Sequence, residues 1–136
     1  MKRFIAIILL LLILTGCTKP AVEAPAIPTQ TISEELVYGE ISGEQMVSLI
    51  GTDVLIIDVR TAEEYAEGHI EGAQNIPVDQ FQTAFDELKL SKDTPMALYC
   101  RSGNRSSVVY RILMDEGFDK IYHAPGVSQY DYPLVK

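Results

Sequence analysis

Short apolar runs alternate with amphipathic segments between residues 33 and 136. The run at residues 54–57 is wholly apolar, and the run at residues 96–99 has a polar group only on its last residue, Tyr99; both are typical of strands buried on both faces. Shorter strands are predicted at residues 73–76, which Pro77 ends, and at about residues 120–122. Because helical patterns separate these strands, the chain is predicted to be an α/β domain with a mostly parallel sheet and helices on both faces.

The predicted helices are recognised by their start signals and by apolar residues at helical spacing. Ser42 with Gln45, and Thr61 with Glu64, have the spacing of a capping box, in which each partner bonds the backbone of the other. The first of these helices carries the apolar stripe Met46, Val47, Leu49 and Ile50. Helices are expected in five places: after Ser42, from Thr61 to near Gly68, over residues 79–88, from the polar loop at residues 100–106 to Gly117, and after Gly126.

The start of the chain is predicted to be a targeting segment rather than part of the folded domain. Lys2 and Arg3 precede an apolar run at residues 4–14, which is too short for a bilayer span of about twenty residues. Residues 1–16 are therefore predicted to be a cleavable signal peptide. The sequence Leu-Thr-Gly-Cys ending at Cys17 resembles the lipobox of bacterial lipoproteins. This resemblance implies a lipidated Cys17 and an extracytoplasmic protein anchored to the membrane; an ordinary secretory signal or an uncleaved anchor is the alternative.

Residues 17–32 are predicted to be a semi-extended tether between the lipidated terminus and the domain at residues 33–136. This stretch is rich in Pro, Ala and Thr, and Pro20, Pro25 and Pro28 are spaced so that neither helix nor strand forms easily.

Composition and charge narrow the possible partners. The chain of 136 residues has a formal net charge of −8, and loss of Lys2 and Arg3 with the leader makes it more acidic. Such a surface repels nucleic acid and anionic lipid, so the acyl chains would have to hold the protein at the membrane. No Cys, His and carboxylate residues have metal-site spacing, and we expect neither a metal nor a cofactor. A monomer is the simplest expectation.

The two cysteines of the chain are Cys17 and Cys100. If Cys17 carries lipid, Cys100 has no disulfide partner, and a free thiol outside the cytoplasm indicates a reactive group. Cys100 follows the strand at residues 96–99 and begins a polar loop that leads into a helix. Backbone N–H groups of such a loop, the helix dipole and the nearby Arg101 and Arg105 are expected to lower the thiol pKa from its usual value of about 8.5.

Three segments in chain order carry a resemblance to a known family. The loop at residues 100–106 reads Cys-Arg-Ser-Gly-Asn-Arg-Ser, residues 57–60 read Ile-Asp-Val-Arg before Glu64-Tyr65, and residues 68–77 read Gly-His-Ile-Glu-Gly-Ala-Gln-Asn-Ile-Pro. These motifs resemble those of single-domain rhodaneses over nearly all of residues 33–136. The resemblance implies a rhodanese-like fold with a five-stranded parallel sheet.

The same resemblance implies a chemistry for the loop. Cys100 would take sulfane sulfur from a small anionic donor such as thiosulfate and pass it from a persulfide to cyanide or a thiol acceptor. The loop would bind the persulfide and the donor through Arg101, Ser102, Gly103, Asn104 and Arg105. A protein that accepts the persulfide sulfur is a further possible partner.

Other polar residues are interpreted as structural. Asp58 and Arg60 follow a buried strand and are expected mainly to pair within the fold, with a substrate-binding role for Arg60 left open. His69 and His123 are expected to be satisfied structural groups.

Two other functions and one departure from the family pattern stay open. Cysteine-dependent phosphatases and arsenate reductases have a loop of the form Cys-x5-Arg, whereas Cys100 and Arg105 form the shorter Cys-x4-Arg. A rhodanese-like binding or regulatory module without activity is the other alternative. Many family members have Gly-Gly and then Trp near the carboxyl end; this chain has Pro125-Gly126, then Tyr130, and no Trp. The departure bears on the substrate and leaves Cys100 as the expected nucleophile.

Overall fold

The computed structural model describes residues 37–136. They belong to a compact unit that spans Glu34–Lys136. The predicted signal peptide at residues 1–16, Cys17 and the predicted tether at residues 17–32 lie outside the described residues. Among the described residues, none of the helices has both the length and the apolar character that a bilayer span requires.

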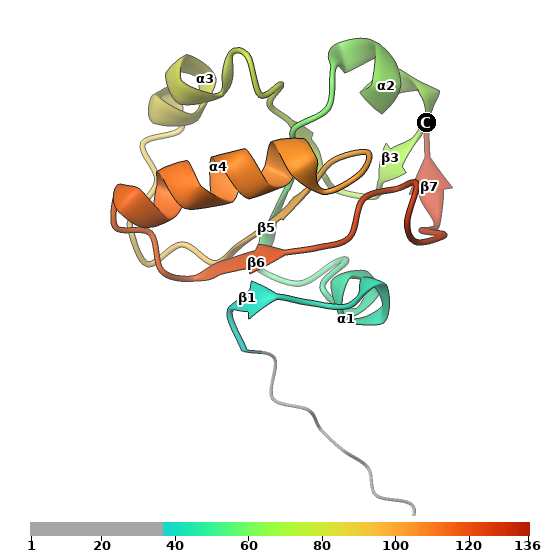
Figure 1. The fold of residues 1–136 in the computed structure, drawn as a ribbon, viewed down its shortest axis with the longest axis horizontal. Coiled ribbons are helices and arrows are strands. Elements are labelled where there is room, and N and C mark those ends of the chain that lie inside the picture. Colours follow the sequence, from blue (N-terminus) through green and yellow to red (C-terminus); the bar gives the residue numbers. More distant parts are fainter. Residues whose placement is uncertain (1–36) are drawn as a thin grey trace, which may run out of the picture. The chain divides into compact units, whose positions relative to one another are not determined.

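The described unit is built on a five-stranded parallel sheet (Figure 1). Its strands follow the order β1-β6-β5-β2-β4, and every neighbouring pair is parallel. The strands are β1 (Gly39–Glu40), β2 (Leu55–Asp58), β4 (Gln74–Asn75), β5 (Met96–Tyr99) and β6 (Ile121–His123). The predicted α/β class and the five-stranded sheet are confirmed.

Helices cover both faces of this sheet, as the hydrophobic pattern of the strands predicted. Along β5, Met96 and Leu98 pack into one apolar cluster, and the intervening Ala97 and Tyr99 pack into another. The first cluster is covered by α3 (Phe81–Glu87) and α4 (Asn104–Asp115), and the second by α1 (Gly43–Ser48). Figure 1 shows α3 and α4 on one side of the sheet and α1 on the other.

Both predicted capping boxes are present. The Ser42 hydroxyl accepts the Gln45 N–H at 3.1 Å, and the Gln45 side chain accepts the Ser42 N–H at 2.8 Å. Thr61 and Glu64 make the same pair of bonds at 3.3 and 3.1 Å, at the start of α2 (Ala62–Glu67). Each box satisfies two backbone N–H groups that a helix start otherwise leaves free.

The predicted helix after Gly126 is wrong, because residues 127–130 form a turn. Two amides of this segment donate to the polar loop. The Val127 N–H donates to Cys100 O at 3.0 Å, and the Ser128 N–H donates to Arg101 O at 2.9 Å. The turn therefore fastens the carboxyl-terminal segment to the polar loop.

Three short strands had no prediction of their own. β1 lies at the sheet edge, and an antiparallel pair joins β3 (His69–Ile70) to β7 (Leu134–Val135). Each of the three spans two residues, which is too short for a periodic pattern to register.

Candidate active site

The polar loop leaves β5 at the carboxyl edge of the sheet and enters α4 directly. Gly103, the residue before α4, has a φ of 84°, a left-handed conformation that favours glycine. Behind the loop, Gly126 packs so closely that a Cβ at this position would overlap the Arg101 carbonyl. The strand end, the glycine turn and the anchoring segment together fix the path of residues 100–103.

The Cys100 sulfur faces the inside of this loop. Its Sγ accepts the Gly103 N–H at 3.1 Å and the Ser106 hydroxyl at 3.5 Å. Burial raises the pKa of the Cys100 thiol, but hydrogen bonds from the Ser106 hydroxyl and from the N–H groups of Ser106, Ser102 and Arg105 outweigh burial and lower the pKa overall. The direction agrees with the sequence-based expectation, and the main cause is hydrogen bonding within the loop.

The other side of the sulfur is apolar. Cys100 belongs to the cluster that contains Leu98 and Val109, and the residue has no exposed surface. The thiol is therefore placed between a polar loop and an apolar wall. Such a site shields the thiol sulfur from water while leaving charge-stabilising donors on one side.

The two loop arginines have different surroundings. Arg101 is exposed, whereas the Arg105 guanidinium is bound by both carboxylate oxygens of Glu64 at 2.6 and 2.9 Å. Hydrogen bonding to Arg105 lowers the pKa of Glu64 to about 2. Arg105 thus acts first as an anchor of the loop, and Arg101 is the loop arginine open to solvent.

Glu64 is a residue of the site that sequence reasoning missed. One carboxylate oxygen accepts the Thr61 N–H at 3.1 Å, as a capping box requires, and the same carboxylate holds Arg105. Glu64 therefore joins the start of α2 to the start of α4. The capping box was visible in the sequence, but its second bond spans 41 residues and has no local signal.

Arg60 lies inside the fold and away from the loop contacts. Its side chain bonds the Asp58 carboxylate, with an Nη2–Oδ2 distance of 2.6 Å, and the Gly68 carbonyl at 2.7 Å. The residue is 5% exposed. This placement agrees with the mainly structural interpretation and leaves no support for the substrate-binding role that was kept open.

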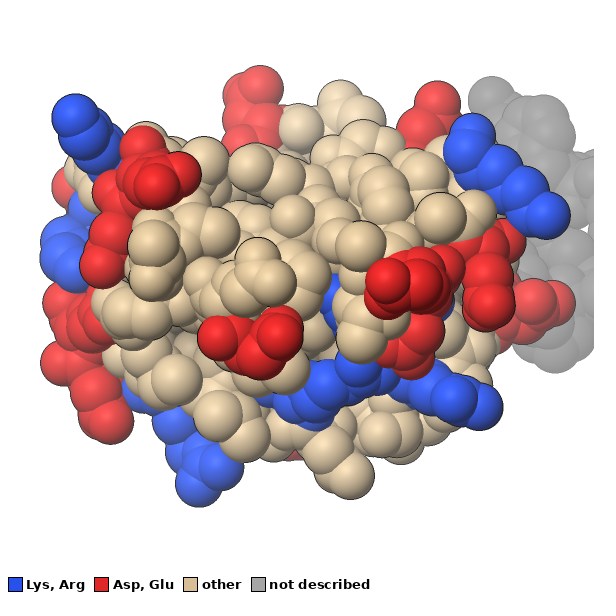
Figure 2. Space-filling view, turned by 90° about the horizontal axis from the view of Figure 1, so that it is seen from above, with Lys and Arg blue, Asp and Glu red and all other residues tan. Residues whose placement is uncertain are grey.

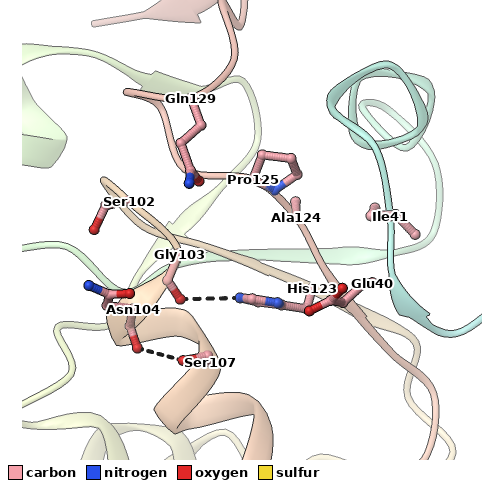
Figure 3. A pocket seen from close by; sticks show the side chains of 10 residues that line it. All are labelled: Glu40, Ile41, Ser102, Gly103, Asn104, Ser107, His123, Ala124, Pro125 and Gln129. Carbon is pink, nitrogen blue, oxygen red and sulfur yellow. Dashed lines mark hydrogen bonds between the residues drawn. The ribbon is translucent and has the colours of Figure 1, made fainter.

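A pocket of about 550 Å³ lies beside the loop (Figure 3). Cys100, Arg101 and Arg105 are not among its lining residues. The predicted loop residues Ser102, Gly103 and Asn104 do line it, from the side of the loop that faces the ends of β1 and β6. The other lining residues are Glu40, Ile41, Ser107, His123, Ala124, Pro125 and Gln129.

The two histidines have separate environments. His69 stacks on Tyr65, with ring centroids 3.7 Å apart, and its Nδ1 lies 3.0 Å from the Tyr65 carbonyl. His123 lies at the end of β6, with its Nε2 3.0 Å from the Ser106 hydroxyl oxygen and 3.3 Å from the Gly103 carbonyl. Only His123 contacts the loop.

Tyr130 lies at a packing position between two segments of the domain. Its ring lies directly on Gly43, where a Cβ would overlap the ring atoms, and its centroid is 4.8 Å from that of Tyr132. Tyr130 therefore closes the space between the carboxyl-terminal segment and the start of α1.

The surface carries both signs of charge. Figure 2 shows acidic and basic side chains interspersed on the face seen from above. An uninterrupted basic surface, the usual mark of a nucleic-acid-binding protein, is not seen on this face.

Comparisons with known proteins agree with this architecture. Residues 42–126 match the family described as Rhodanese-like domain, and residues 1–18 match a prokaryotic membrane lipoprotein lipid attachment site. The chain resembles a rhodanese-related protein from Thermoplasma volcanium, with 26% identity, a TM-score of 0.63, and coverage of 72% of this chain and 98% of the other. It also resembles an Escherichia coli rhodanese solved with anions, with 30% identity, a TM-score of 0.55, and coverage of 60% and 96%.

Curated relatives are much longer than this chain. A tRNA uridine(34) hydroxylase of Hamiltonella defensa is 37% identical over 78 residues, which are 54% of this chain and 22% of the relative. The corresponding protein of Escherichia coli strain ED1a is 29% identical over 109 residues, which are 77% of this chain and 30% of the relative. The likeness thus covers less than a third of each relative.

Proposed function

Because this chain belongs to the rhodanese-like domain family, we propose that it is a sulfurtransferase in which Cys100 carries the transferred sulfur as a persulfide. The observation that carries the proposal is the position of the Cys100 sulfur, 3.1 Å from the Gly103 amide and within a loop whose hydrogen bonds lower the thiol pKa. A thiolate so stabilised is both the nucleophile and the later leaving group that sulfur transfer requires.

The first half-reaction uses an anionic donor such as thiosulfate. The Cys100 thiolate attacks the sulfane sulfur, the S–S bond of the donor breaks, and sulfite leaves with the bonding electron pair. The outer sulfur then carries the negative charge, which the backbone N–H groups of the loop at residues 101–105 would stabilise. Exposed Arg101 attracts the donor from solvent.

The second half-reaction returns the enzyme to its first state. Cyanide or a thiolate attacks the outer sulfur of the persulfide, and the Cys100 thiolate leaves with the electrons of the broken S–S bond. Because a covalent intermediate separates the two steps, the kinetics are expected to be ping-pong.

The chemistry is tested with the full chain in detergent. The wild-type protein should form thiocyanate from thiosulfate and cyanide, and Cys100→Ser should abolish this activity. Absence of both thiocyanate and a persulfide in the wild type would overturn the proposal in favour of a binding module. Hydrolysis of an aryl phosphate that depends on Cys100 would favour the phosphatase alternative instead.

A membrane-anchored, extracytoplasmic location is part of the proposal. It is supported by the match of residues 1–18 to a lipoprotein attachment site. In bacterial cells fed an alkyne-labelled fatty acid, the wild-type chain should be labelled and should sediment with membranes. Cys17→Ser should lose the label. Equal labelling of both proteins would contradict lipidation at this residue.

A further inference from the structure

A series of short polar contacts leads from the nucleophile to a histidine outside the loop. Ser106 Oγ lies 3.5 Å from Cys100 Sγ, 3.1 Å from the Gly103 carbonyl oxygen and 3.0 Å from His123 Nε2. His123 Nε2 also lies 3.3 Å from the Gly103 carbonyl oxygen, a contact that Figure 3 shows. Ser106 is fully buried, so its hydroxyl depends on these groups for hydrogen bonds.

The hydrogen-bonding capacity of each group fixes the direction of the bonds. A carbonyl oxygen only accepts, so the contact with Gly103 O, as a hydrogen bond, assigns the Nε2–H tautomer to His123. With that hydrogen in place, Nε2 also donates to Ser106 Oγ. The Ser106 hydroxyl has a single hydrogen. That hydrogen can be donated to either of two acceptors, the Gly103 carbonyl oxygen or the Cys100 sulfur.

His123 favours donation of the Ser106 hydroxyl hydrogen to the Cys100 sulfur over donation to the Gly103 carbonyl. The Gly103 carbonyl already accepts the Ser107 N–H at 2.9 Å and shares the His123 Nε2–H, and by donating to Ser106 Oγ the imidazole polarises the hydroxyl so that its hydrogen is a better donor. A hydroxyl that donates to sulfur favours the thiolate over the thiol. The Ser106 hydroxyl is the leading hydrogen-bond cause that lowers the Cys100 pKa.

We propose that His123 is a positioning residue for the Cys100 nucleophile, which it reaches through Ser106 by holding the hydroxyl hydrogen on the sulfur. The inference rests on the proposed role of Cys100 in sulfur transfer, but concerns a residue that neither the loop motif nor the resemblance singles out.

The groups around His123 and Cys100 enter the design of the test. Glu40 on β1 is the neighbour of His123 across the sheet, and the Tyr110 ring on α4 lies 5.9 Å from the imidazole. Arg105 is the charged side chain that interacts with the sulfur. All three are left unchanged in every variant, so that a difference in pH dependence reports on His123.

The variants Gln and Asn separate the positioning role from simple packing. In His123→Gln the amide nitrogen can take the place of Nε2, whereas in His123→Asn it takes the place of Nδ1 and is too short to reach Ser106. His123→Leu removes the donor, and Ser106→Ala removes the intermediate hydroxyl.

The measurement is the rate of Cys100 alkylation by iodoacetamide against pH, in the full chain with Cys17 replaced by Ser. His123→Leu and His123→Asn should move the profile to higher pH and slow alkylation at neutral pH by roughly three- to tenfold, the worth of one such hydrogen bond. His123→Gln should restore the wild-type profile. In the Ser106→Ala background, His123→Leu should cause no further change in the alkylation profile.

The opposite results overturn the inference. Wild-type alkylation in both His123→Leu and His123→Asn would show that His123 does not act on the sulfur. Equal impairment of the Gln and Asn variants would show that the imidazole acts by shape alone. A wild type that follows the expected alkylation pattern but forms no persulfide would leave this inference standing and overturn the proposed function.

Discussion

Two arginine–carboxylate pairs in this domain have similar geometry and different surroundings. The Asp58–Arg60 pair is buried, with side chains 0% and 6% exposed, and joins residues two positions apart. The Glu64–Arg105 pair is 23% and 30% exposed and joins α2 to the start of α4. Both have N–O distances of 2.6 Å. Burial sets what each pair contributes to stability, and position sets what it does for the nucleophile.

The buried pair organises the end of β2. Arg60 extends from Asp58 to the Gly68 carbonyl, and the Asn75 side chain donates to the backbone carbonyls of both Asp58 and Arg60 at 3.0 and 2.9 Å. This network ties the segment after β2 to the segment that leads into β4. The partly exposed pair instead holds a residue whose own N–H faces the Cys100 sulfur.

The largest effect on stability is expected from breaking the buried pair. Asp58→Asn leaves the Arg60 charge buried without its counterion, which should lower the free energy of unfolding by about 3–5 kcal/mol in chemical denaturation. Replacing both residues with apolar ones, Asp58→Leu with Arg60→Met, should cost less than the single change. A loss below about 1 kcal/mol for Asp58→Asn would show that the pair is not shielded from water.

Breaking the partly exposed pair should affect stability less and activity more. Glu64→Gln keeps an oxygen for the Thr61 N–H but removes the charge that holds Arg105, so the free energy of unfolding should fall by about 1 kcal/mol or less. Thiocyanate formation should slow severalfold, because the Arg105 amide near the sulfur loses its anchor. Unchanged activity with a large loss of stability would reverse the contrast between the two pairs.

The pH dependence of stability sharpens the same contrast. Because the pKa of Glu64 is lowered from 4.5 to about 2, the pair contributes stability that is fully present above pH 4.5 and is lost as the pH falls toward 2. The difference in unfolding free energy between wild type and Glu64→Gln should therefore be constant at higher pH and shrink over this window. A difference that disappears near neutral pH would contradict the assignment to Glu64.

The smallest effect is expected from a pair at the surface. Lys120 Nζ lies 3.6 Å from Asp93 Oδ1, with side chains 39% and 83% exposed. Asp93→Asn should change the free energy of unfolding by no more than about 0.5 kcal/mol and leave thiocyanate formation unchanged. The variant is the matched control for the other two, and a larger loss would mean that exposure does not rank these pairs.

Sequence reasoning succeeded where the physical signal is local. Uninterrupted apolar runs revealed β2 and β5, the spacing of Ser42 and Thr61 to their partners revealed two helix starts, and the Cys100 loop carried its own motif. Contacts between distant segments had no such signal. The bond of Glu64 to Arg105, the approach of His123 to Ser106 and the turn after Gly126 depend on how segments meet in space.

In the proposed mechanism, loop hydrogen bonds favour the Cys100 thiolate, which then holds a second sulfur atom. The most direct test is intact-protein and peptide mass spectrometry of the wild type and Cys100→Ser after treatment with thiosulfate and removal of excess donor. We expect a mass increase of one sulfur atom on the peptide that contains Cys100, lost on addition of cyanide and absent in Cys100→Ser. A wild-type chain that gains no mass, or gains it equally in Cys100→Ser, would contradict the claim.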